Sequence, residues 1–422
     1  MHIIHFSDVH IGVENYSKPD SETGLSTRLK DFLDTFDELV DFSINENVDL
    51  VVFSGDAYKS RDPNQTQQRE FAKRIMRLSQ AKIPVFLLAG NHDVPHVVER
   101  ASSLEIYRTL EIENVYTADT LGIHNIDTKN GPIQILALPW IRKSNLLAQG
   151  VDLEGKSHEE INLEIQNRIA NSVQTLALQL DPKIPAICSA HITIFESVTS
   201  TEVSMMLGSD HGLSTNQLAL PCFDYVALGH IHKYQILNEE KPLMVYPGSL
   251  QRVDFGEEKD TKGFCSIILD PKADVGDRIK DFKFKEVKAR KFKTIAISIP
   301  NKELELNNEL DPTKIIVDKI NSEQIEDAIV KLDISISSDL SPRIDDSAVR
   351  NALNKAHYLV SINKNILEQT DTRNSDIEQN HLSPLKALEL YFKRRGFSED
   401  RIDELLKYGV EIINQHDIES NQ

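Results

Sequence analysis

The chain has 422 residues, with 47 Lys and Arg against 66 Asp and Glu, and a formal net charge of -19. This length exceeds what one hydrophobic core usually covers, so we expect more than one domain. The contents of 40% hydrophobic and 27% charged residues are those of a globular protein and exclude global disorder. The acidic balance argues against a protein that coats nucleic acid through bulk charge.

The sequence also indicates the cellular compartment of the protein. No run of 18 apolar residues is present, so we expect no membrane-spanning helix. The first residues, MHIIHF, form a strand-like run without a basic signal-peptide region, which predicts a chain that is not exported. The three cysteines, Cys188, Cys222 and Cys265, are an odd number without a CxxC pair. They argue against a disulfide framework and a thiolate metal site, and they favour the reducing cytoplasm.

The first 290 or so residues alternate short apolar runs with helical stretches. The predicted strands are His2–Phe6, Leu50–Ser54, Val85–Ala89, Ile133–Leu138, Ala186–Ala190, Tyr225–Leu228 and Phe264–Leu269. The predicted helices, from apolar residues at helical spacing, are Leu29–Val48, Gln67–Gln80 and Val97–Leu110. Strands separated by helices predict an α/β sandwich for residues 1–290.

A second unit is expected after the charged stretch Asp277–Lys293. Residues 291–366 form a small α/β module in this prediction, with strands at Thr294–Ile299 and Ala328–Ile336 and helices at Pro312–Ile320 and Asp346–Ala356. The polar, aperiodic residues 367–382 predict a linker. Residues 383–422 predict two helices, because Ser383, Pro384 and Ser398 are typical of helix N-termini.

Side chains of the metal-ligand type follow five of the predicted strands. In chain order they are Asp8 and His10, Asp56, Asn91 with His92, His191, and His230 with His232. Each motif alone is more often a turn or a buried core histidine. Five such motifs at five strand ends indicate a site, because a rigid sheet can aim several loops at one point. Gly55, Gly90 and Gly229 allow tight turns that bring the next side chain towards a shared centre.

The residue types indicate the chemistry. Oxygen and imidazole donors without cysteine suit Mn²⁺, Mg²⁺, Fe²⁺ or Zn²⁺. Seven residues are too many for one tetrahedral ion and fit two ions, with Asp56 as our choice for the shared carboxylate. Two such ions attract a phosphodiester, lower the pKa of a bound water and clamp the phosphate oxygens. His92 is not needed as a ligand, and we expect it to stabilise the transition state or to protonate the leaving oxygen.

The order DVH, GD, GNHD, H and GHIH resembles that of the calcineurin-like metallophosphoesterases, and within them the SbcD-type DNA double-strand-break repair nucleases. The runs SAHITIFES and YPGSLQRVDFGE (Tyr246–Glu257) support the closer resemblance. It implies a calcineurin-like β-sandwich flanked by helices, two manganese ions and a catalytic His92. The ligand sets that it implies are Asp8, His10, Asp56 and His232 for one ion, and Asp56, Asn91, His191 and His230 for the other.

One stretch departs from the phosphatases of the same superfamily. They carry GDxxDRG, whereas this chain has GDAYKSR at Gly55–Arg61, which disfavours the phosphatase branch. Lys59 and Arg61 are candidates for contacts with DNA phosphate. Two solvated loop cations are an equally good interpretation of the same residues.

The resemblance also implies roles for the remaining parts. Residues 291–366 would cap the cleft, and residues 383–422 would dock on an SbcC-type coiled-coil ATPase. The apolar residues that two short helices cannot all bury are Leu385, Leu388, Tyr391, Phe392, Leu405 and Leu406. We favour the partner over the chain's own cap as their contact, because a polar linker precedes them.

A homodimer within a heterotetramer is implied as well, through helices beside the active site. The candidate interface residues are Phe71, Ile75, Met76, Leu104, Ile106 and Tyr107. Taken singly, each of them is more commonly a residue that faces its own sheet.

The favoured function is a manganese-dependent DNA nuclease, with 3′→5′ exonuclease and single-strand endonuclease activity in DNA end processing. Magnesium also suits the ligands. The first alternative is a phosphodiesterase or phosphatase for a small substrate, against which the YPGS run, the cap and the tail argue. The second is a scaffold that has lost turnover, against which the complete set of ligands argues.

Overall fold

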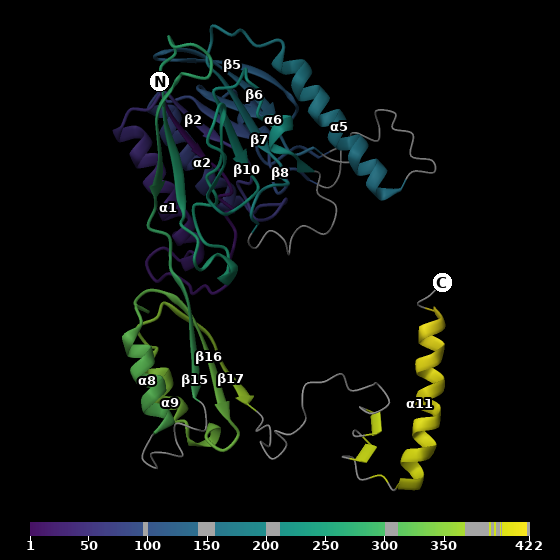
Figure 1. Ribbon diagram of the computed structural model, residues 1–422. Coiled ribbons are helices and arrows are strands. Elements are labelled where there is room, and N and C mark those ends of the chain that lie inside the picture. The colour runs from purple at the N-terminus through teal and green to yellow at the C-terminus, as the bar shows by residue number, and fades with distance from the viewer. Residues whose placement is uncertain are drawn as a thin grey trace. The chain divides into compact units, whose positions relative to one another are not determined.

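The computed structural model describes residues 1–95, 100–141, 157–199, 212–299, 311–367, 388–389, 392–393, 397 and 399–419. It divides into two compact units, Met1–Asn365 and Ile366–Gln422 (Figure 1). Among the described residues, no helix has the length and apolar content that a bilayer crossing requires.

Two six-stranded sheets make up most of the first unit. The first sheet has the order β14 (Ile279–Glu286), β13 (Gly263–Leu269), β1 (His2–Phe6), β2 (Leu50–Phe53), β3 (Val85–Leu88), β4 (Val115–Ala118). The second has the order β11 (Gln235–Asn238), β12 (Leu243–Tyr246), β10 (Tyr225–Gly229), β7 (Ala186–His191), β6 (Gly131–Leu138), β5 (Gly122–Thr128). Strands β1 to β4 are parallel, and so are β6, β7, β10 and β12. In each parallel set the carboxyl ends therefore meet at one edge of the sheet.

The two sheets pack face to face because their apolar side chains alternate along the strands. Ile3 and Val52 belong to the core between the sheets, whereas Ile4 and Val51 belong to the core outside the first sheet. This period of two places both faces of each central strand in an apolar layer. The α/β sandwich predicted from the alternation of strands and helices is confirmed.

Helices cover both outer faces of the sandwich. Helices α1 (Thr27–Asn45), α2 (Gln65–Gln80) and α3 (Glu105–Thr109) cover the first sheet. Helices α5 (His158–Ala177) and α6 (Thr215–Leu218) cover the second. The starts of α1 and α2 follow local rules, since the side chains of Ser26 and Asn64 accept from the N–H groups of Leu29 and Gln67.

The structure differs from the sequence-based expectations at three places. The described part of Val97–Leu110 is helical only at α3, and the 20-residue helix α5 was not foreseen. The charged stretch Asp277–Lys293 is not simply a boundary, because it contains β14. This strand forms an edge of the first sheet, with Phe282 and Phe284 packed against the core between the sheets and Lys280 and Lys283 exposed.

A third sheet follows the sandwich along the chain and has an apolar core of its own. It consists of β15 (Phe292–Ile299), β16 (Ile329–Ser337) and β17 (Tyr358–Leu367), in that order. Helices α8 (Pro312–Ser322) and α9 (Asp346–Ala352) lie on one face of it and share its apolar cluster (Figure 1). The third strand, β17, was not predicted.

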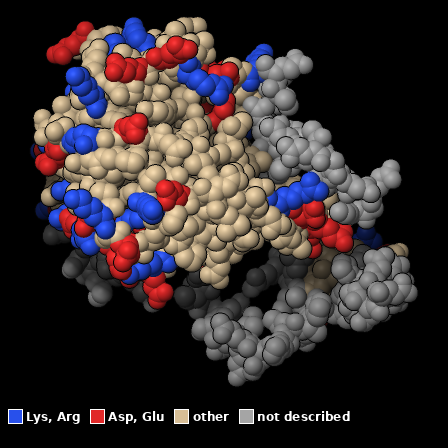
Figure 2. All heavy atoms as spheres, turned by 90° about the horizontal axis from the view of Figure 1, so that it is seen from above, with Lys and Arg blue, Asp and Glu red and all other residues tan. Residues whose placement is uncertain are grey.

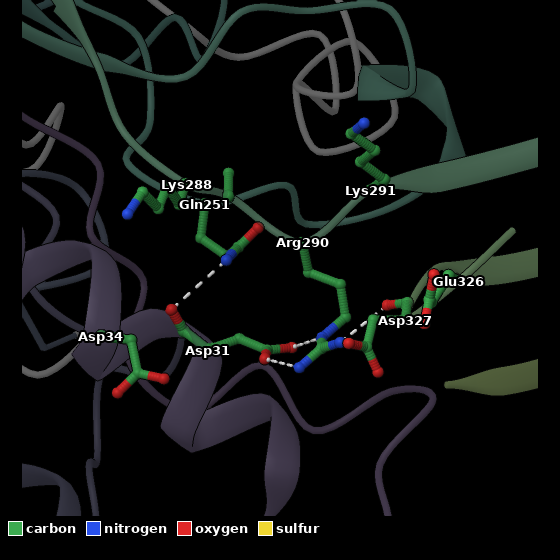
Figure 3. A pocket seen from close by; sticks show the side chains of 9 residues that line it. Asp31, Asp34, Gln251, Lys288, Arg290, Lys291, Glu326 and Asp327 are labelled. Carbon is green, nitrogen blue, oxygen red and sulfur yellow. Dashed lines mark hydrogen bonds and ion pairs between the residues drawn. The ribbon is translucent and has the colours of Figure 1, made fainter. Parts of the chain in front are cut away.

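The connection between β14 and β15 lines a polar cavity of about 280 Å³ beside α1 (Figure 3). Arg290 Nε and Nη2 donate to the carboxylate of Asp31 at 2.7 and 2.5 Å, and its Nη1 donates to the carbonyl of Asp327 at 2.7 Å. Gln251 Nε2 donates to the carbonyl of Asp31 at 3.3 Å. These bonds join α1 of the sandwich to the loop before β16.

The second unit contains α11 (Glu399–Glu419). Ile402 is buried, and Leu388 packs where Gly409 leaves room for it on this helix. Leu405 and Leu406 are half-buried. Ser383, Pro384, Leu385, Tyr391 and Ser398 lie outside the described residues, as does the predicted linker after residue 367.

Most of the candidate dimer residues are core residues. Phe71, Ile75, Leu104 and Tyr107 are all at most 2% exposed and belong to the apolar layer outside the first sheet. Ile106 is 50% exposed. The interpretation that these side chains face their own sheet is therefore correct for four of the six.

Stability should fall in mild acid because of buried His5 on β1. Burial lowers the pKa of His5 from 6.5 to about 3. Between these values the unfolded chain binds a proton that the folded chain does not, so this contribution is complete above pH 6.5 and is lost as the pH falls. The loss is about 1.4 kcal/mol per pH unit.

Denaturant unfolding at pH 7, 6 and 5 with a chelator measures this slope without any contribution from metal release. His5→Phe should reduce the dependence of the unfolding free energy on pH, since it removes the titrating group. An unchanged slope in the variant would contradict the assignment to His5.

Candidate metal centre

The two sheets touch at their carboxyl edges through Ser54, which follows β2. Its hydroxyl lies 3.1 Å from the hydroxyl of Ser189 on β7 and donates to the carbonyl of Ala227 on β10 at 3.2 Å. Its carbonyl accepts from Nδ1 of His191 at 2.8 Å. The ends of β2, β7 and β10 are therefore adjacent, and the side chains that follow them meet.

Four of the predicted side chains form what we call the first ligand group, namely Asp8, His10, Asp56 and His232. His10 Nε2 lies 2.8 Å from His232 Nε2, 3.9 Å from Asp8 Oδ1 and 3.6 Å from Asp56 Oδ2. All four residues are buried.

Asp56 also belongs to a second ligand group, with Asn91, His191 and His230. His191 Nε2 lies 3.5 Å from Asp56 Oδ2 and 2.9 Å from Asn91 Oδ1. His230 Nδ1 lies 3.2 Å from the same Asn91 oxygen. The structure thus brings all seven predicted side chains together, with Asp56 beside members of both sets that the resemblance implies. Ligand atoms of Asp8, Asp56 and His191 also lie within 4.8 Å of one another, so the two sets adjoin.

The charges of this cluster call for a cation. Asp8 and Asp56 are at most 1% exposed, and burial raises the pKa of Asp8. Burial opposes ionisation of Asp56 too, but the charges of His191 and His92 outweigh it and hold its pKa well below the usual range. Burial likewise lowers the pKa of His191, and the Asp56 carboxylate outweighs this and raises it to about 9. A histidine that is protonated at neutral pH here supplies positive charge that a metal ion could replace.

The donor atoms also fit metal ions. Two imidazole nitrogens of His10 and His232 face each other, and only one of them can carry the proton of a hydrogen bond between them. Carboxylate, amide and imidazole donors at these positions suit hard and borderline divalent ions. The residues present therefore fit a pair of divalent cations.

Strained backbone places these side chains. Four of the seven candidates have φ in the left-handed region: Asp8 (53°), His10 (49°), Asp56 (64°) and His230 (105°). Such conformations cost about 1–3 kcal/mol each in non-glycine residues and persist where surrounding structure imposes them. Their concentration at one edge of the sheets is typical of a functional site.

The glycines predicted to permit close approach do so. A Cβ on Gly55 would lie 2.3 Å from His191 Nδ1, and one on Gly229 would lie 2.0 Å from the carbonyl oxygen of Ser54. A Cβ on Gly90 would lie 2.2 Å from Asp56 Oδ1. A side chain at Gly55 or Gly90 would displace a member of the ligand groups, and one at Gly229 would displace the Ser54 backbone to which His191 is bonded.

Gly90→Ala should weaken the binding of Mn²⁺ by about tenfold or more. The added Cβ would overlap the Asp56 carboxylate, and such overpacking costs roughly 1–3 kcal/mol. Equilibrium dialysis measures this. Gly122→Ala is the matched control, since a Cβ there meets nothing within 4 Å. Equal affinities of the two variants would show that the contact does not matter.

His92 lies beside both ligand groups. Its backbone N–H donates to Asp56 Oδ1 at 2.8 Å, and its Nδ1 lies 2.8 Å from the carbonyl of Lys59. Since a carbonyl only accepts, Nδ1 carries the hydrogen and Nε2 is the nitrogen left for proton exchange. The nitrogen and oxygen atoms of His10, Asp56 and His92 also lie within 4.8 Å of one another.

Lys59 and Arg61 are partly buried rather than fully solvated. Burial lowers the pKa of Lys59, against the charge of Asp56. Arg61 Nε donates to the carbonyl of Asn91 at 2.8 Å. Both cations therefore lie beside the loops that carry the ligand groups.

Three further residues at the centre were not singled out from the sequence. Asp93 accepts from the backbone N–H groups of Asp56, Ala57 and Gly90 at 2.8–3.0 Å, and so ties two ligand loops together. The ring of Trp140 lies 5.3 Å from that of His230. Glu257 is bonded to His232. Two sequence signals could have pointed to these residues. Asp93 directly follows the GNH residues that include a ligand, and Glu257 ends the YPGSLQRVDFGE run.

The sandwich and these donors define a candidate dinuclear metal centre. A family model of the calcineurin-like phosphoesterases matches residues 1–234. Because this match spans more than half of the 422 residues, the chain belongs to the calcineurin-like phosphoesterase family.

Individual proteins are also similar to this chain. The DNA double-strand break repair protein Mre11 of Archaeoglobus fulgidus is 23% identical over 340 residues, which cover 78% of this chain and 70% of that protein. A dimetal phosphatase from Danio rerio is 11% identical, covering 63% of this chain and 92% of its own, with a TM-score of 0.34. A Thermus thermophilus protein is 14% identical, covering 68% and 98%, with a TM-score of 0.35. Both scores are below 0.5, so the family assignment depends on the sequence match.

Proposed function

We propose that this protein is a two-metal DNA nuclease that hydrolyses phosphodiesters in double-strand break repair. The observation that carries the proposal is the convergence of seven side chains around Asp56, at the edge where the two sheets meet. Two divalent ions, with manganese as our choice, would be held by these groups and would supply the charge that activates water and neutralises phosphate oxygens.

The residues of the chain itself have separable roles in this proposal. Asp93 and the strained backbone hold the ligand loops in place. His92 Nε2 exchanges the proton with the leaving oxygen, while its Nδ1 stays bonded to the Lys59 carbonyl. Lys59 and Arg61 contact DNA phosphates in this proposal.

The similarity to the repair protein favours DNA over a small substrate. The family model covers residues 1–234, whereas the alignment with the repair protein covers 78% of the chain. The similarity therefore extends beyond the part that carries the family signature. By analogy we propose 3′→5′ exonuclease and single-strand endonuclease activity, with residues 291–366 as a cap that restricts access to the centre.

Partners are part of the proposal. We assign the segment 383–422 to docking on an SbcC-type ATPase and expect a homodimer within a heterotetramer. Tyr408 and Val410 on α11 are 59% and 37% exposed, which supports a contact surface there. Basic and acidic side chains are interspersed on the face seen in Figure 2. With a net charge of -19, the isolated chain should bind DNA weakly at physiological salt and more tightly with its partner.

A nuclease assay tests the proposal. A labelled hairpin and a blunt duplex are incubated with Mn²⁺, Mg²⁺ or chelator, with and without the ATPase, beside a small phosphodiester reporter. We expect degradation of DNA that the chelator abolishes. Hydrolysis of the reporter without attack on DNA would replace the proposal by a small-substrate phosphodiesterase. Two bound ions without any hydrolysis would replace it by a scaffold.

A further inference from the structure

Glu257 ends the short 3₁₀ helix η2 (Phe255–Glu257) and is fully buried beside His232. Its Oε1 accepts from His232 Nδ1 at 2.7 Å, and its Oε2 lies 2.8 Å from Lys262 Nζ. The same Oε2 accepts from the backbone N–H of Val253 at 3.0 Å. A buried carboxylate that accepts from several donors is held in one orientation.

This bond fixes the proton on the imidazole of His232. An ionised carboxylate only accepts, so Nδ1 of His232 carries the hydrogen and Nε2 keeps its lone pair. That Nε2 lies 2.8 Å from His10 Nε2, inside the first ligand group. Glu257 thus selects the tautomer that a metal-binding histidine needs.

Residues near Glu257 in the sequence also hold the backbone of His232. Lys262 Nζ donates to the His232 carbonyl at 3.0 Å and to the hydroxyl of Ser249 at 2.9 Å. Gly248 has a φ of 73°, and a Cβ there would lie 2.5 Å from the same carbonyl oxygen. The run Tyr246–Glu257 contributes no residue to either ligand group. It nevertheless packs around His232, which belongs to the first group.

A second contact ties the run to the connection before the third sheet. Arg252 Nε donates to the carbonyl of Glu257 at 3.2 Å. Its Nη1 donates to the carbonyl of Arg290 at 3.1 Å, and its Nη2 to the carbonyl of Asp260 at 2.7 Å. The loop that carries Glu257 is thereby fixed on both sides.

We propose that Glu257 is a positioning residue for His232, with Lys262 as its charge partner, and that it sets the metal affinity of the first ligand group alone. This inference rests on the proposed function. Glu257 bonds to His232, which belongs to the first ligand group and not to the second, so the second group should keep its affinity when Glu257 is changed.

Two readouts separate the two ligand groups. Equilibrium dialysis against Mn²⁺ counts all bound ions. Trp140 is the single tryptophan of the chain, and its ring lies 5.3 Å from His230 and 6.2 Å from His191, both in the second ligand group. Quenching of its fluorescence by paramagnetic Mn²⁺ therefore reports on the second group.

In Glu257→Gln, we expect one of the two ions to bind about 10–100-fold more weakly. The midpoint of Trp140 quenching should stay at the wild-type value, and raised Mn²⁺ should restore hydrolysis. Glu240→Gln, at an exposed glutamate, is the control and should behave as wild type. Unchanged affinity for both ions, or equal weakening of both, would overturn the inference.

A second variant tests the inference if Glu257→Gln fails to fold. Glu257→Gln leaves Lys262 without its buried partner, whereas the double variant Glu257→Gln/Lys262→Met removes both charges. The double variant should lose the same ion. A wild-type chain that binds no Mn²⁺ overturns the proposed function together with this inference. A wild-type chain with two ions and a double variant with the same two affinities overturns the inference alone.

Discussion

Asp56→Asn should abolish hydrolysis and the binding of both metal ions. The Asp56 carboxylate lies 3.6 Å from His10 Nε2 and 3.5 Å from His191 Nε2, so it is the one side chain that belongs to both ligand groups. Loss of metal-derived stabilisation of several kcal/mol corresponds to a fall in rate of at least about 1,000-fold. Metal analysis of the dialysed protein and a hydrolysis assay measure the two effects.

The fold should survive this change. Asparagine keeps the shape of the side chain and can still accept the N–H of His92, which now bonds to Asp56 Oδ1. Asp62→Asn is the control, because the Asp62 side chain is 80% exposed and lies only six residues along the chain. An Asp56→Asn protein that retained two ions would show that the shared carboxylate is not a ligand.

His92→Asn should separate metal binding from turnover. We expect the turnover number to fall by about 10²–10⁴-fold, which is the usual contribution of a general acid. Metal content should stay at the wild-type level, because each ligand group is complete without His92. Single-turnover hydrolysis and metal analysis of the same preparation give the two numbers.

Two outcomes would contradict this role. A normal rate would show that His92 transfers no proton in the slow step. Loss of a metal ion would show that His92 is a ligand. Its closeness to His10 and Asp56 is compatible with that role. His357→Asn, at a partly buried histidine outside the ligand groups that lies beside Thr27, serves as the control for replacement of a histidine.

The strands that carry the ligand groups could be predicted because their signal is local. Each is a short apolar run followed at once by a turn and polar side chains, and β1, β2, β3, β7 and β10 lie within a residue or so of their expected bounds. Helix α5 escaped because its apolar positions are spread among polar ones. Its capping box, in which Ser157 and Glu160 bond each other's backbone, was nevertheless present in the sequence.

Other features could not be predicted from the sequence, and the reasons are physical. Strand β14 is an edge strand, and the lysines that protect an edge resemble the charges of a linker. Glu257 stands in a glycine-containing run where an acidic residue is usually solvated, and only the packed structure buries it against His232 and Lys262.

The sequence by itself determined the chemical types of the donors, the strand ends that carry them and the glycines that let them approach, since all of these depend on neighbours along the chain. Tertiary structure decided which donors meet. His10 and His232 are 222 positions apart, and they face each other only because the two face-to-face sheets meet at their carboxyl edges beside Ser54. The sharing of Asp56 and the support of His232 by Glu257 depend on that same long-range packing, which no local pattern encodes.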